Sequence, residues 1–141
     1  MKTARKHLKL LSLILILVLS GCSTTKDNFF SRTYHQTTAK YNGYFNANES
    51  LKIGLKKIKD AHEENYQVII PPDKINRTEV VGQVFPNMDR AIEKTTKVIV
   101  RHSMEINNKE KNKWIDDNYF LMARARFYKK EYLASLNTFK Y

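Results

Sequence analysis

The stretch that decides the fold is the C-terminal segment 114–141, WIDDNYFLMARARFYKKEYLASLNTFKY. It fits a 34-residue helix–turn–helix repeat in which an aromatic residue precedes a Leu-Gly pair, and an Ala-x3-Phe segment follows in the second helix. The positions that match this pattern are Tyr119 (aromatic), Met122 (Leu), Ala123 (Gly), Ser135 (small residue) and Phe139. The match predicts two antiparallel helices joined by a short turn.

Repeats of this kind are tetratricopeptide repeats, so we expect an all-α fold that begins an α-solenoid. Tyr132 should begin the second helix, and the small residues Ala123 and Ser135 should let the two helices approach closely. The side chains expected to fill the seam are Met122, Phe127, Leu136 and Phe139. Arg126 stands where the pattern has Tyr, and the closing Pro would lie beyond Tyr141. A plain antiparallel hairpin is therefore the alternative.

The N-terminal segment has the features of a lipoprotein signal peptide. Residues 1–9 carry four cationic side chains and no acidic one, and residues 10–19 read LLSLILILVL, too short to span a bilayer. Leu19, Ser20, Gly21 and Cys22 follow, and they resemble a bacterial lipobox. We therefore predict a signal peptide over 1–21 and acylation of Cys22, which would hold the protein to a membrane through its acyl chains. The alternatives are an uncleaved anchor or an ordinary buried cysteine.

Composition limits the remaining function classes. The chain of 141 residues has 25 basic and 14 acidic side chains, and removal of the signal peptide lowers the net charge from +11 to +7. That charge suits anionic lipid headgroups near the anchor, and no nucleic-acid-binding motif accompanies it, so nucleic acid is not an expected partner. A single Cys excludes an internal disulfide framework and a cysteine-cluster zinc site.

The mature chain divides into four predicted parts. A polar tether (22–28) leads to an aromatic-rich helical pair (29–64), an extended connector (65–86), and helices ending in the partial repeat (87–141). Aromatic residues between Phe29 and Phe45 are expected to pack between helices, with a stacking platform for sugars or bases as the alternative. Asn87 is the expected N-cap of the next helix, and a polar turn is expected at 107–113. Lysines 52, 56 and 59 repeat at helical spacing and predict a solvated face.

No motif for catalysis, cofactor binding or metal binding is found. His35, His62 and His102 lack short metal-ligand spacing, and His102 is expected to pack as a neutral side chain in the apolar stripe of its helix. The chain has no phosphate loop, dinucleotide fingerprint or nucleophile elbow. We therefore predict no catalytic residues, no cofactor and no metal.

Three segments together resemble a known family. They are FFSRTYHQTTAKYNGYFNANESL (29–51), PNMDRAIEKTTKVIVRHSM (86–104) and WIDDNYFLMARARFYKKEYLASLNTF (114–139). In this order after a lipobox, they resemble the N-terminal part of the SprE/PorW gliding-motility and type IX secretion lipoproteins of Bacteroidetes. The resemblance implies a periplasm-facing, outer-membrane lipoprotein with tetratricopeptide repeats, which serves as a structural part of the machinery. Only the acylated cysteine carries over, onto Cys22.

The expected function is that of a non-enzymatic scaffold that binds protein components of a secretion and motility complex. One alternative is a repeat lipoprotein that assembles another envelope complex, and another is a cell-wall-acting enzyme with the 29–45 aromatics as its substrate platform. Because residues 114–141 fill only part of a repeat, we also expect this chain to be the front end of a longer protein.

Overall fold

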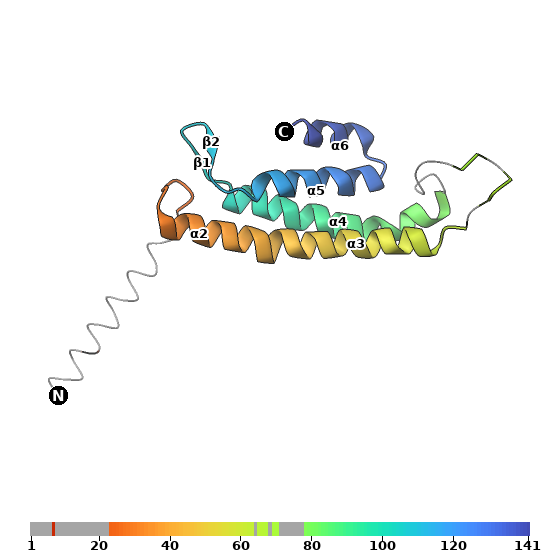
Figure 1. Cartoon of the computed structure of the whole chain (residues 1–141), viewed down its shortest axis with the longest axis horizontal. Coiled ribbons are helices and arrows are strands. Elements are labelled where there is room, and N and C mark those ends of the chain that lie inside the picture. Colours follow the sequence, from red (N-terminus) through yellow and green to blue (C-terminus); the bar gives the residue numbers. More distant parts are fainter. Residues whose placement is uncertain (1–6, 8–22, 64, 68, 71–77) are drawn as a thin grey trace.

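The computed structural model describes residues 7, 23–63, 65–67, 69–70 and 78–141. These residues are almost entirely helical, which confirms the predicted all-α class. The helices run antiparallel along one common axis, and a small hairpin lies at the end where α2 begins (Figure 1). The lipobox and Cys22 lie outside the described residues, and so do residues 71–77 of the predicted connector.

The N-terminal helical region is one continuous rod and not the predicted helical pair of 29–64. It consists of α2 (Phe29–Thr38), the π-helical segment η1 (Ala39–Tyr44) and α3 (Phe45–Asp60). Asn28 caps it by accepting a 2.7 Å hydrogen bond from the backbone N–H of Ser31. Within η1 the helix has a wider turn but continues in the same direction. Gly43 therefore lies inside a continuous helix, and no turn between two helices is formed there.

The rod buries a stripe of mostly small residues spaced four apart. Its members are Ser31, His35, Ala39, Gly43, Ala47 and Leu51. A four-residue spacing drifts by about 40° per step around an α-helix of 3.6 residues per turn. The wider π turn, in which the Phe45 N–H donates to the Lys40 carbonyl five residues back, reverses part of that drift. The stripe therefore keeps facing α4.

Helix α4 (Thr78–His102) begins earlier than the predicted start at Asn87, so the predicted connector 65–86 is helical from Thr78 onward. Pro86 lies inside the helix, where a proline costs about 3 kcal/mol. Val84 and Met88 flank it and are fully buried, and each contributes about 1.5–3 kcal/mol. Together the two side chains contribute about 3–6 kcal/mol, which is enough to offset the cost of the proline. The buried face of α4 consists of Val84, Met88, Ala91, Thr95 and Val98.

A two-stranded antiparallel hairpin occupies the region predicted as a polar turn. Strands β1 (Glu105–Ile106) and β2 (Lys109–Glu110) pair through a two-residue turn, Asn107–Asn108, in which both residues have φ 55°. Two positive φ values are the geometry that a type I′ turn requires and that Asn tolerates. The Glu110 carboxylate accepts hydrogen bonds from the backbone N–H groups of Met104 and Asn112, at 2.8 and 2.7 Å. These bonds fix the hairpin at the end of α4.

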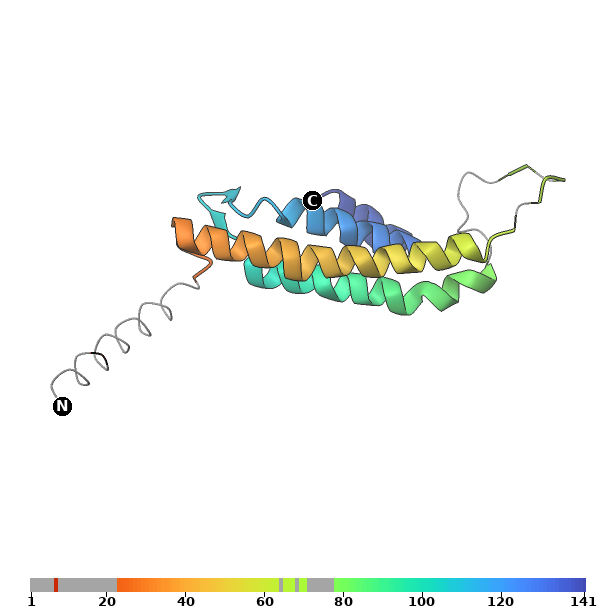
Figure 2. The ribbon, with the colours of Figure 1, turned by 60° about the horizontal axis from the view of Figure 1, so that its bottom comes forward.

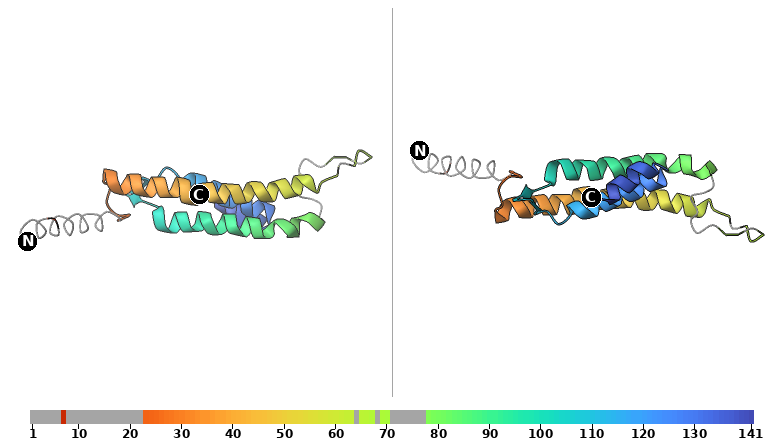
Figure 3. Two further views of the ribbon diagram at one scale, coloured as in Figure 1. Left: turned by 90° about the horizontal axis from the view of Figure 1, so that it is seen from below. Right: turned by 90° about the horizontal axis from the view of Figure 1, so that it is seen from above.

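The C-terminal segment is a helical hairpin of α5 (Ile115–Tyr128) and α6 (Tyr132–Phe139). Figures 2 and 3 show α5 lying over the pair formed by α3 and α4, with α6 on the outer side of α5. Leu121 and Ala125 of α5 complete a core with Leu51 of α3 and Met88 of α4. The connection includes Lys130 at φ 64°.

Candidate functional site

The crossing of α5 and α6 is built on the two predicted small residues. Ala123 is fully buried, and the Ser135 hydroxyl donates a 2.8 Å hydrogen bond to the Ala123 carbonyl. A hydroxyl can reach a backbone carbonyl of the facing helix only where no large side chain intervenes. Tyr132 is the first residue of α6. The structure therefore brings Ala123 and Ser135 together where the repeat pattern places them.

The predicted seam residues are less buried than expected, although two of the exposed ones contact the facing helix. Met122 is buried, but Phe127, Leu136 and Phe139 are exposed. Helix α6 turns Ser135 and Thr138 toward α5, and Leu136 points outward. Phe139 still meets Phe120 of α5, and Phe127 meets Tyr132 of α6, with 5.7 and 5.6 Å between the ring centroids. The expected seam role is therefore wrong for Leu136, whereas the rings of Phe127 and Phe139 contact the facing helix from exposed positions.

Arg126 contributes a contact that the sequence pattern did not reveal. Its Nη1 donates to Thr138 Oγ1 at 3.1 Å and lies 3.5 Å from the Ala134 carbonyl. It therefore joins α5 to α6 from the position where the repeat pattern has Tyr. Tyr119 lies half-buried at the other end of α5 and stacks on Tyr141, with 3.6 Å between ring centroids.

An apolar surface runs along the outer side of the hairpin, and we call it the α6 face. Its members are Phe120, Tyr132, Leu133, Leu136 and Phe139. Leu133 is 73% exposed and Leu136 is 51% exposed. Phe120 and Phe139 meet edge to face across the two helices, with 5.7 Å between their centroids. A contiguous exposed apolar surface is typical of a site of protein contact.

Most of the N-terminal aromatic residues are exposed, although they were predicted to pack between helices. Phe29 and Phe30 are 76% and 79% exposed, and Tyr34, Tyr41 and Phe45 are exposed as well. Two of the rings do reach another element: the Tyr44 ring lies 5.4 Å from that of Trp114, and the Tyr34 ring lies 6.1 Å from that of His102 in α4. The small-residue stripe occupies the buried face of the rod, which leaves most of the aromatics on the outside.

Two histidines that are 67 residues apart in sequence meet at one end of the bundle. His35 Nδ1 and His102 Nδ1 lie 2.9 Å apart, and the Tyr34 ring packs against both. Burial lowers the pKa of His35, and burial followed by the charges of His35 and Arg101 lowers the pKa of His102. Both rings are therefore neutral near pH 7, and one donates to the other. His35 lies on the buried stripe of the rod, and His102 is half-buried one turn beyond Val98 on α4. The sequence pattern placed His102 on an apolar stripe but gave no signal for its contact with His35.

The structure shows no assembled metal site in the parts of the chain that it describes. Across these residues, no three His, Cys, Asp or Glu side chains are grouped to hold a metal ion.

On the exposed side of α3, Lys52 pairs with Glu49 at 2.8 Å and Lys56 pairs with Asp60 at 2.6 Å. These contacts fit the predicted solvated face.

None of the described helices combines the length and the hydropathy that crossing a bilayer requires. The sequence matches no model of a known protein family and no curated protein.

Proposed function

We propose that the protein is an outer-membrane lipoprotein without enzymatic activity, which faces the periplasm and serves as a helical-repeat scaffold in type IX secretion and gliding motility. The observation that carries the proposal is the α6 face, an exposed apolar surface on a hairpin whose close-contact residues fit a tetratricopeptide repeat. The lipobox and the three segments that resemble the SprE/PorW lipoproteins supply the cellular setting.

The arrangement of the tether suits a membrane anchor at Cys22. The Ser31 hydroxyl donates a 2.5 Å hydrogen bond to the Ser23 carbonyl, and Asp27 pairs with Arg32. The guanidinium of Arg32 holds the pKa of the Asp27 carboxyl below its usual range, so the pair is ionised at neutral pH. The tether is thus fixed to the first turns of α2. Acyl chains on the residue before Ser23 would hold this end of the bundle at the bilayer surface.

A scaffold binds other proteins through surfaces that are not needed for its own fold. Leu133 and Leu136 lie outside the described core, and α6 packs on α5 through Ser135 and Thr138. Burying the two exposed leucines against a partner would contribute about 1.5–3 kcal/mol each before losses of entropy. A general role in assembling another envelope complex would use the same surface, and the resemblance to secretion lipoproteins favours the specific role.

The test is replacement of the chromosomal gene by one encoding Leu133→Ser/Leu136→Ser in the full-length protein. Because both side chains are largely exposed, the variant should fold and reach the membrane in normal amounts. We expect it to secrete less type IX cargo and to glide more slowly than the wild type. Lys59→Gln, an exposed substitution on α3, is the matched control and should behave as the wild type. Normal secretion and gliding by the leucine variant would contradict the proposal.

A further inference from the structure

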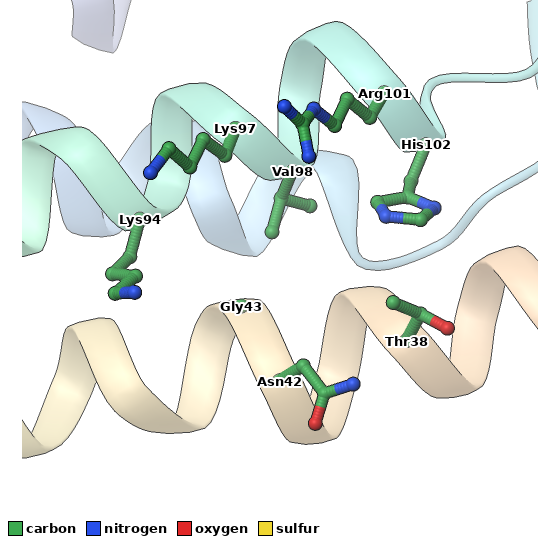
Figure 4. A pocket seen from close by; sticks show the side chains of 8 residues that line it. All are labelled: Thr38, Asn42, Gly43, Lys94, Lys97, Val98, Arg101 and His102. Atoms are coloured by element: carbon green, nitrogen blue, oxygen red, sulfur yellow. The ribbon is translucent and has the colours of Figure 1, made fainter.

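A cavity of about 190 Å³ lies between α4 and the π-helical segment of the rod (Figure 4). Gly43 and Val98 approach each other closely at the bottom of the cavity, and the His102 side chain lies at one end of it. A single water molecule needs about 10–15 Å³ of such volume, so the cavity has room for a tetrahedral oxyanion with several waters. π-helical segments occur frequently at functional sites.

The charged side chains that line this cavity are all cationic. Lys94, Lys97 and Arg101 follow one another along α4 at spacings of three and four residues, which places them on one side of the helix (Figure 4). Lys97 pairs with Glu93, whereas Lys94 and Arg101 form no hydrogen bond or ion pair with another described residue. Like charges at these spacings repel one another. The hydrogen bond from Lys97, followed by the charges of Lys97 and Lys94, lowers the pKa of Glu93, so this carboxylate already offsets part of the repulsion.

The facing helix adds neutral polar groups to the same cavity. Thr38 and Asn42 line it, and their side chains likewise have no hydrogen-bond partner within the described part of the chain. Lysine and arginine side chains only donate hydrogen bonds, whereas a hydroxyl or an amide group can donate as well as accept them. The cavity therefore offers donors from two helices and no carboxylate. That composition matches the oxygens of a phosphate group, which Arg can bind in bidentate fashion.

The cavity lies near the point where the tether meets the rod. Thr38 is seven residues beyond Ser31, the residue that holds the Ser23 carbonyl, which corresponds to about 10 Å along a helix. If Cys22 carries acyl chains, phospholipid headgroups are close to this end of the bundle. A phosphate group could thus come from a lipid headgroup or from free phosphate.

We propose that the cavity between η1 and α4 is a phosphate-binding site in which Lys94 and Arg101 supply the principal ligands and Thr38 and Asn42 supply further hydrogen bonds. This assignment is independent of the scaffold role, because the site lies on the rod and on α4 and shares no residue with the α6 face.

The experiment uses the full chain in neutral maltoside micelles. Inorganic phosphate is titrated by calorimetry at constant ionic strength, and binding of phosphatidylglycerol is counted by native mass spectrometry, with diacylglycerol as the lipid lacking phosphate. We expect at least one of the two phosphate probes to bind, and diacylglycerol not to bind. Binding of inorganic phosphate identifies a site for the free anion, and binding of phosphatidylglycerol alone identifies a headgroup site.

Lys94→Gln and Arg101→Gln should each weaken binding about tenfold or more, since each removes a charge-assisted hydrogen bond. Lys59→Gln removes the same charge from exposed α3 and should leave binding unchanged. Circular dichroism spectra that match the wild type would show that the variants are folded. The proposal is overturned if neither phosphate probe binds, if diacylglycerol binds as well as phosphatidylglycerol, or if Lys59→Gln weakens binding as much as Lys94→Gln.

Discussion

Replacing Gly43 by alanine tests the contact between the π-helical segment and α4. A Cβ at this position would lie 1.8 Å from Val98 Cγ2 and 3.2 Å from Val98 Cβ. Val98 is buried, and a β-branched side chain in a helix has essentially one favourable χ1 rotamer. The clash can therefore be relieved only by moving the two helices apart or by forcing Val98 out of its rotamer.

The expected size of the effect follows from two opposing contributions. Overpacking a core costs about 1–3 kcal/mol, and an overlap this large belongs near the upper limit. In a helix interior, alanine raises the free energy of unfolding by about 1 kcal/mol relative to glycine. The net loss of unfolding free energy is about 2 kcal/mol, which for a chain of this size lowers Tm by about 8 °C. Thermal melts followed by circular dichroism measure it.

Gly54→Ala is the matched control in the same rod. Its Cβ would lie 2.4 Å from Met88 Cε, the end of a flexible side chain, and 3.2 Å from Asn87 Cβ. Because Met88 can move its terminal methyl group, the change in Tm should be much smaller. Gly43→Ala combined with Val98→Ala should melt close to Val98→Ala alone, since the overlap with Cγ2 is then gone and only the 3.2 Å approach to the Cβ of residue 98 remains. If Gly43→Ala instead raises Tm as helix propensity alone predicts, the close approach is refuted.

The other predictions concern the anchor, the hairpin and the histidine pair. Cys22→Ala should abolish incorporation of a fatty-acid analogue and leave an uncleaved precursor, and equal labelling would contradict acylation. Ala123→Leu should lower unfolding free energy by about 1–3 kcal/mol through overpacking, whereas Leu136→Ser, at an exposed position, should leave the melt unchanged. Burial lowers the pKa of His35 and His102 below 6.5, so the unfolded chain binds more protons and stability should fall as pH drops below about 6.5. Denaturant titrations at pH 7.5 and 5.5 should show this fall, and an equal stability at both would count against the buried pair.

Local patterns predicted the parts of the fold that depend on neighbouring residues. The hairpin of α5 and α6 follows from a repeat signature within 28 residues, and the second helix begins at the expected residue, Tyr132. The lysine face of α3 follows in the same way from its helical spacing. Here each position's environment is set by residues one or two turns away.

The parts that the sequence did not predict depend on contacts between distant helices. The rod buries Ala39, Gly43 and Ala47, residues too small to form an apolar stripe in a hydropathy pattern, while the conspicuous aromatics are exposed. Pro86 indicated a connector, but burial of Val84 on its N-terminal side extends α4 through it. The basic cavity was equally hidden, because its two walls come from different helices.

Photo-crosslinking from the α6 face in living cells tests the scaffold proposal most directly. A photoreactive residue is placed at position 136 in the full-length protein, with position 59 on α3 as the control, and crosslinked proteins are identified by mass spectrometry. We predict strong crosslinks from position 136 to components of the type IX secretion or gliding machinery, and weak ones from position 59. Crosslinks from position 136 that are no stronger than those from position 59, or that capture only components of an unrelated complex, would contradict the proposed function.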